Sequence, residues 1–122
     1  MQIETHPANG RKTAEVVSDT IVLSTAEDGL DLLGNLYYQG FDNILLYEKN
    51  IAPAFFDLKT GIAGEVLQKF SNYRVRLAIV GEFAPYQSKS IKDFMFESNR
   101  AGHINFVPSK AEALERLSHS LT

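Results

Sequence analysis

The sequence alternates short apolar runs with longer amphipathic segments, and this alternation is the feature that most limits the folds open to the chain. Continuous apolar runs occur at residues 43–47 (NILLY), 75–80 (VRLAIV) and 104–107 (INFV). Such runs are typical of strands that are covered on both faces. Strands that alternate with helices are joined by right-handed crossovers, and we therefore expect a largely parallel sheet.

Four helices are expected before, between and after these runs. Thr25 can cap a helix that extends to about Gln39, with a buried stripe formed by Leu30, Leu33, Leu36 and Tyr37. Apolar spacing predicts a second helix over residues 60–71 and a third that ends near residue 102. A serine and a glutamate three residues apart, at positions 109 and 112, form a capping-box pattern that opens the last helix.

The first residues favour a β-hairpin. Asn9 and Gly10 stand between two strand-like stretches, and an Asn-Gly pair accepts the positive φ angles of a tight hairpin turn. We expect an α/β sandwich with a mostly parallel sheet of four to five strands, an N-terminal antiparallel hairpin and about four helices. Because no linker or repeat interrupts residues 1–122, we expect a single domain.

Composition excludes several classes of function. The 122 residues contain no cysteine, which excludes disulfides, thiolate metal sites and cysteine nucleophiles. The formal charge of −3 and the lack of a basic run with interleaved aromatics argue against nucleic-acid binding. No apolar run is long enough to span a membrane. We therefore expect a cytoplasmic protein.

Charge is unevenly distributed along the chain. Residues 13–48 contain seven acids and neither lysine nor arginine, whereas residues 69–110 contain seven bases against three acids. This asymmetry gives two alternatives: solvated faces that keep the protein soluble, or faces of opposite sign that attract a charged partner or a second copy.

The sequence resembles two known families. The order of elements, the stretch LKTGIAG at residues 58–64 and the ending INFVPSKAEALERL resemble the STAS domain of bacterial anti-sigma-factor antagonists. That resemblance implies a regulatory module whose second helix opens with a phosphorylatable hydroxyl. The stretches FFDLKTGIAGEVLQKFSNYRVRLAIVGEF and FMFESNRAGHINFV resemble more closely a small bacterial family known only as a domain of unknown function (number forty-one-eighty), which implies no activity.

Thr60 is the candidate for modification or anion binding. Its hydroxyl is expected at a helix start beside Lys59 and Gly61, where the helix N-terminus and the lysine would stabilise a phosphate. The alternative is that Thr60 only caps the helix.

Acids at predicted strand ends are the candidates for a ligand or metal site. Glu48 and Glu82 follow two parallel strands, and with Asp57 they could hold a magnesium ion for phosphoryl transfer or hydrolysis. Ordinary solvated loop acids are the alternative. No glycine-rich phosphate loop occurs, and the three histidines lack the spacing of a ligand set, so no cofactor or metal is assigned.

Loop aromatics are the candidates for partner binding. Phe55 and Phe56 follow Pro53, and Phe83 and Tyr86 occupy another predicted loop. They either fold inward as covers for the sheet edge or form an exposed anchor patch for another protein or a second copy. The expected function is a non-catalytic regulatory or interaction module of a bacterium that is switched by phosphorylation or by small-ligand binding. The alternatives are a small metal-assisted phosphate-handling enzyme and a homodimeric scaffold.

Overall fold

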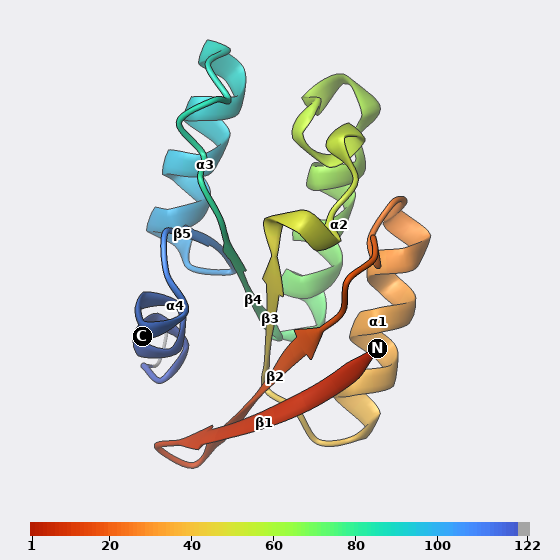
Figure 1. Cartoon of the computed structure of the whole chain (residues 1–122), viewed down its shortest axis with the longest axis vertical. Helices are drawn as coiled ribbons and strands as arrows, with labels where there is room; N and C mark the ends of the chain where they lie inside the picture. Colours follow the sequence, from red (N-terminus) through yellow and green to blue (C-terminus); the bar gives the residue numbers. More distant parts are fainter. Residues whose placement is uncertain (120–122) are drawn as a thin grey trace.

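The structure, a computed structural model, describes residues 1–119 and consists of a five-stranded sheet with four helices (Figure 1). The strands are β1 (Gln2–Ala8), β2 (Arg11–Val17), β3 (Asn43–Tyr47), β4 (Arg76–Val80) and β5 (Ile104–Val107). The helices are α1 (Ala26–Tyr38), α2 (Ile62–Tyr73), α3 (Lys89–Ala101) and α4 (Lys110–Leu117). Three short 3-10 turns, η1 (Glu48–Asn50), η2 (Pro53–Phe56) and η3 (Leu58–Thr60), connect β3 to α2.

The sheet has the order β1-β2-β3-β4-β5, in which only β1 and β2 pair antiparallel. Asn9 and Gly10 join this hairpin with φ angles of 53° and 77°, as the Asn-Gly pair predicts. The α/β class, the mixed sheet and the hairpin predicted from the sequence are therefore confirmed.

Helices cover both faces of the sheet, and the alternation of side chains along each strand divides the core in two. Ile44 and Leu46 of β3 face the larger cluster, which includes residues of α1, α2 and α3. Leu45 faces the smaller cluster, where Ala113 and Leu117 of α4 pack on the sheet. Residues on both faces are apolar because the strands are covered on both sides, which explains their continuous apolar runs.

Polar caps fix three of the four helix starts. The Thr25 hydroxyl accepts a hydrogen bond from the Asp28 N–H, and the Asp28 side chain accepts from the Thr25 N–H in return. Ser88 and Ser109 accept from backbone N–H groups at the starts of α3 and α4. Helix α2 differs, because Gly61 occupies its cap position with a φ angle of 78° and offers no side chain.

The buried stripe of α1 differs from the predicted one. Leu33 and Leu36 are buried as expected, but Leu30 is 36% exposed and Tyr37 is 46% exposed. Helices α1 and α2 lie side by side (Figure 1), and a Cβ at Gly29 would lie 3.0 Å from Val66 Cγ2. The missing side chain of Gly29 lets α2 approach α1 closely. The buried face of α1 therefore includes Gly29 and Leu32, and Leu30 and Tyr37 lie at its margin.

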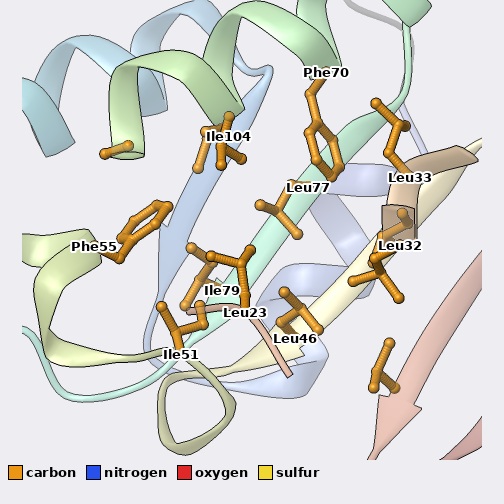
Figure 2. Packing of buried hydrophobic residues seen from close by; sticks show 14 of the residues in the cluster. Leu23, Leu32, Leu33, Leu46, Ile51, Phe55, Phe70, Leu77, Ile79 and Ile104 are labelled. Carbon is orange, nitrogen blue, oxygen red and sulfur yellow. The ribbon is translucent and has the colours of Figure 1, made fainter. Parts of the chain in front are cut away.

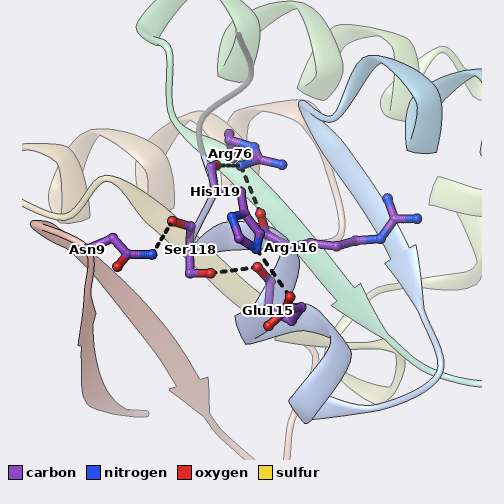
Figure 3. Close-up of polar contacts among 6 residues, drawn as sticks. All are labelled: Asn9, Arg76, Glu115, Arg116, Ser118 and His119. Atoms are coloured by element: carbon purple, nitrogen blue, oxygen red, sulfur yellow. Dashed lines mark hydrogen bonds and ion pairs between the residues drawn. The ribbon is translucent and has the colours of Figure 1, made fainter.

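The C-terminal end of α4 is tied to the sheet by Arg76 of β4. The Arg76 guanidinium donates hydrogen bonds to the backbone oxygens of Arg116 and His119, at 3.1 and 2.6 Å, and to that of Gly102 at 2.8 Å. Figure 3 shows the first two bonds together with the bond from the Asn9 side chain to a carbonyl oxygen at the same helix end. These donors satisfy carbonyls that an α-helix leaves unpaired at its C-terminus.

Candidate functional site

Glu48 connects the end of β3 to the loop between β4 and α3. Its Oε1 accepts a hydrogen bond from the Glu82 N–H at 3.1 Å, and its Oε2 accepts one from the Tyr86 hydroxyl. Burial and the Glu48 carboxylate raise the pKa of Tyr86 to about 12. Because both carboxylate oxygens already accept hydrogen bonds, Glu48 holds this loop in place.

A crevice opens where the loops after β4 and β5 separate. It has a volume of about 330 Å³ and is lined by residues 81–83 and 106–108. The first loop leads to α3 and the second to α4, which cover opposite faces of the sheet. Diverging loops at the carboxyl ends of parallel strands are the usual place for a ligand in an open α/β sheet.

The two strand-end acids, Glu48 and Glu82, and the nearby Asp57 are not grouped closely enough to share a metal ion. Glu82 is exposed, and the Asp57 side chain accepts a hydrogen bond from the Lys59 N–H. Across residues 1–119, the one group of three side chains close enough to share an ion lies elsewhere, on the β1-β2 hairpin. Glu48 and Asp57 thus form hydrogen bonds within the loops, and Glu82 lies exposed beside Glu48.

Of the two alternatives for the four loop aromatics, the structure favours the one in which they fold inward over the sheet edge. Phe55 is 0% and Phe56 is 7% exposed, and Figure 2 shows Phe55 pointing into the core cluster beside the sheet. Phe56 stacks on Tyr86 with ring centroids 4.5 Å apart, and half-buried Phe83 lies 5.4 Å from the ring of Phe106. These rings cover the carboxyl edge of the sheet and leave no exposed anchor at Phe55 or Phe56.

Thr60 is exposed and ends η3, two residues before α2 begins. Its hydroxyl lies 2.8 Å from the Ala54 carbonyl oxygen and 2.9 Å from that of Asp57, and it accepts from the Ile62 N–H at 3.3 Å. The flanking Lys59 and Gly61 are exposed. The hydroxyl therefore joins two 3-10 turns to the start of α2.

A buried carboxylate on the hairpin was not identified from the sequence. Glu15 of β2 is 4% exposed, and its Oε2 accepts a hydrogen bond from the Tyr47 hydroxyl at 2.7 Å. Its Oε1 lies 2.8 Å from His6 Nε2 and 2.9 Å from Lys110 Nζ. The four side chains come from β1, β2, β3 and the first residue of α4.

The partners of Glu15 control its protonation. Burial alone raises the pKa of a carboxyl group, but hydrogen bonds from Tyr47, Lys110 and His6 outweigh burial and lower the pKa of Glu15 to about 2. The same contact raises the pKa of Tyr47 to about 12, after burial as the larger cause. Glu15 is therefore a carboxylate and Tyr47 a neutral donor at neutral pH.

Comparison with known proteins identifies the family. The sequence model of the family described as a domain of unknown function, DUF4180, matches residues 8–117. The chain belongs to the DUF4180 family. No curated protein and no solved structure matches this DUF4180 chain. Within the described residues, no helix combines the length and the apolar character that crossing a bilayer requires.

The DUF4180 domain exposes a second aromatic group, at the C-terminal ends of α1 and α2. Tyr37, Tyr38 and Tyr73 are 46%, 89% and 44% exposed. The ring of Tyr37 lies 5.9 Å from that of Tyr38 and 5.5 Å from that of Tyr73, both in edge-on geometry. We call these three residues the tyrosine patch. The sequence pattern assigned Tyr37 to the core because the spacing of apolar residues cannot tell a buried ring from an exposed one at the margin of a stripe.

Proposed function

We propose that this DUF4180 domain is a non-catalytic interaction module that binds a basic partner protein on the outer face of α1. The observation that carries the proposal is the tyrosine patch, in which three large rings meet at the surface. Single exposed apolar side chains are ordinary on protein surfaces, but groups of aromatic rings are typical of binding sites.

The charge along α1 favours a basic partner. Glu27, Asp31 and Tyr38 are exposed, and their spacing of four and seven residues places them along one face of α1. Residues 13–48, which include the whole of α1, contain neither lysine nor arginine. An arginine or lysine of a partner can therefore pair with the carboxylates and lie over a tyrosine ring, where cation–π attraction adds to the ion pair.

The enzyme alternative has less support. Both oxygens of Glu48 are occupied by hydrogen bonds within the domain, and the strand-end acids are not grouped around a position for an ion. The crevice of about 330 Å³ is the place where a small ligand would bind.

A STAS-like regulatory role is supported by the order of elements, since the hairpin, the alternating helices and strands and the final helix follow the order expected of that domain. Phosphorylation of Thr60 belongs to this proposal. A phosphate on Thr60 would break the hydroxyl contacts to two carbonyl oxygens and bring negative charge toward them, so it would loosen η2 and η3. The role in a bacterium and the cytoplasmic location stay predictions.

The partner is tested by capture from cells that contain the protein, followed by binding of the purified partner. We expect Tyr37→Ala with Tyr38→Ala, and separately Asp31→Lys, to weaken binding at least about tenfold, the usual loss for an aromatic or charged hot spot. Phe96→Ala is the matched control, because Phe96 is 62% exposed on α3, away from the tyrosine patch. Binding should also weaken with added salt.

The controls separate the alternatives. Binding that survives the tyrosine and Asp31 substitutions would overturn the proposal, as would a captured partner without lysine or arginine at its contact. If sedimentation instead reveals a dimer that the tyrosine substitutions dissociate, the occupant of the face is a second copy and the basic partner is wrong. Mass spectrometry of the isolated protein, with Thr60→Ala as the blank, tests phosphorylation independently.

A further inference from the structure

We infer that Glu4, His6 and Glu15 form a binding site for a late first-row divalent metal ion such as Zn²⁺, and that Lys110 competes with the ion for Glu15. The site lies on the β1-β2 hairpin and is independent of the proposed docking face on α1. It rests on the juxtaposition of one imidazole and two carboxylates on the face of the sheet that α4 partly covers.

The register of the hairpin brings the three ligands together. Glu4 pairs with Glu15 across the two strands, and His6 pairs with Thr13. Residues two apart on a strand point to the same face, so Glu4, His6 and Glu15 project from one side of the sheet. One ligand atom of each lies within 4.8 Å of the others.

The two oxygens of Glu15 have different partners. Tyr47 donates to Oε2 at 2.7 Å and so fixes the orientation of the buried carboxylate. Oε1 faces His6 Nε2 at 2.8 Å. Tyr47 acts here as a positioning residue, in the way that outer hydrogen bonds commonly orient the ligands of a metal ion.

The ligand types favour Zn²⁺ and similar ions over Mg²⁺ or Ca²⁺. Imidazole is a ligand of late transition metals, whereas Mg²⁺ and Ca²⁺ prefer sites built from oxygen alone. Ligand bonds of about 2.0–2.2 Å around Zn²⁺ require the imidazole nitrogen and the Glu15 oxygen to move apart by a few tenths of an ångström. The His6 side chain is 28% exposed and Glu4 is exposed, so both can adjust while Glu15 stays fixed.

Lys110 is the competing cation. Its ammonium group lies 2.9 Å from Glu15 Oε1, the oxygen that the ion would use. The Lys110 side chain is 42% exposed, so it can move into solvent with its proton when an ion binds. The divalent ion then takes the place of the Lys110 ammonium and is attracted by the negative charges of both Glu4 and Glu15. The His6 nitrogen that binds the ion must carry no proton.

A small pocket borders His6, one of the three ligands. It has a volume of about 210 Å³, and its wall includes His6, Arg11, Thr13, Leu114 and Leu117. Three protein ligands leave a zinc ion at least one position for water or a small ligand.

The test is titration of the metal-free protein, residues 1–122, with Zn²⁺ by calorimetry and by competition with a chromogenic zinc chelator at neutral pH. We expect one ion per chain. Glu4→Gln and His6→Gln should each weaken binding at least about tenfold, because each removes a ligand. Glu4 is exposed, and glutamine at position 6 keeps a hydrogen-bond donor for Glu15, so both variants are expected to stay folded.

Two further variants complete the test. Lys110→Met should bind Zn²⁺ several-fold more tightly, because the competing ammonium is gone. His119→Gln is the control for a histidine outside the site, and its affinity should equal that of the unchanged protein. The inference is overturned by binding weaker than about 1 mM, by equal affinity of the His6 and His119 variants, or by Lys110→Met that binds no more tightly. Circular dichroism of each variant checks that it is folded.

Discussion

Glu48 and Gly81 lie so close together that a Cβ on Gly81 would be 2.6 Å from both the Cβ and the Oε1 atom of Glu48. The carboxylate cannot turn away without losing its hydrogen bonds to the Glu82 N–H and the Tyr86 hydroxyl. Gly81 is thus required by lack of space at the junction of β4 and its loop. This junction also borders the crevice at the carboxyl ends of β4 and β5.

Gly81→Ala is therefore expected to lower the free energy of unfolding by about 1–3 kcal/mol, the usual cost of forcing extra atoms into a packed site. Urea unfolding measures the change. Gly64→Ala is the control, because a Cβ at Gly64 in α2 meets nothing within 4 Å. That substitution should stabilise the protein by about 0.5–1 kcal/mol through helix propensity and a less flexible unfolded chain. Equal changes in the free energy of unfolding for Gly81→Ala and Gly64→Ala would show that the contact between Gly81 and Glu48 leaves room for a Cβ.

The sequence was sufficient to predict the fold because the decisive signals are local. The Asn9-Gly10 turn, the cap at Thr25 and the cap at Ser109 all lie where the structure has them. The start of α2 was predicted two residues early, because threonine is a residue type that often caps helices. In the structure the Thr60 hydroxyl bonds within η3, and Gly61 takes the cap position.

The sites were harder to predict because they depend on tertiary contacts. The grouping of Glu4, His6 and Glu15 could have been predicted from the sequence. A two-residue turn at residues 9 and 10 fixes the hairpin register, and this register sets Glu4 opposite Glu15. The contacts of Tyr47 and Lys110 with Glu15 could not have been predicted in this way, because these two residues come from β3 and α4. The burial of Phe55 likewise depends on 3-10 turns that fold back over the core.

The aromatic loops and the tyrosine patch differ in what they contribute to stability. Phe55→Ala should lower the free energy of unfolding by about 3–5 kcal/mol, since the ring is 0% exposed. Tyr38→Ala should change it by less than about 0.5 kcal/mol, because that side chain is 89% exposed. Thermal unfolding of the two variants separates a core residue from a surface residue. A large loss in Tyr38→Ala would mean that the tyrosine patch is structural.

Glu15 makes stability depend on pH at the acid end. Its folded pKa of about 2 lies below the ordinary value of 4.5, so the unfolded chain binds the proton more readily than the folded one. The stabilisation is present above about pH 4.5 and is lost as the pH falls through about 2. It amounts to at most about 3 kcal/mol, because each unit of difference between the folded and unfolded pKa corresponds to about 1.36 kcal/mol.

Glu15→Gln checks this assignment. The variant should be less stable at neutral pH, because Lys110 loses its charged partner, and its stability should fall less steeply between pH 4.5 and 2. Urea unfolding at several pH values measures the slope. Parallel curves for the two proteins would show that other carboxylates cause the acid sensitivity.

Arg76 should decide whether α4 stays attached to the sheet. An eight-residue helix is not stable by itself, so α4 depends on its packing and on the carbonyl contacts that Arg76 makes at its end. Arg76→Met keeps most of the apolar stem but removes every donor. We expect the free energy of unfolding to fall by about 2–3 kcal/mol and the amides of α4 to exchange faster than those of α1.

Arg100→Met is the control, since the Arg100 side chain is 68% exposed and reaches Glu97 only at 3.5 Å. This substitution should lower the free energy of unfolding by less than about 0.5 kcal/mol. Unchanged exchange in α4 of Arg76→Met would mean that Ala113 and Leu117 hold the helix through packing alone.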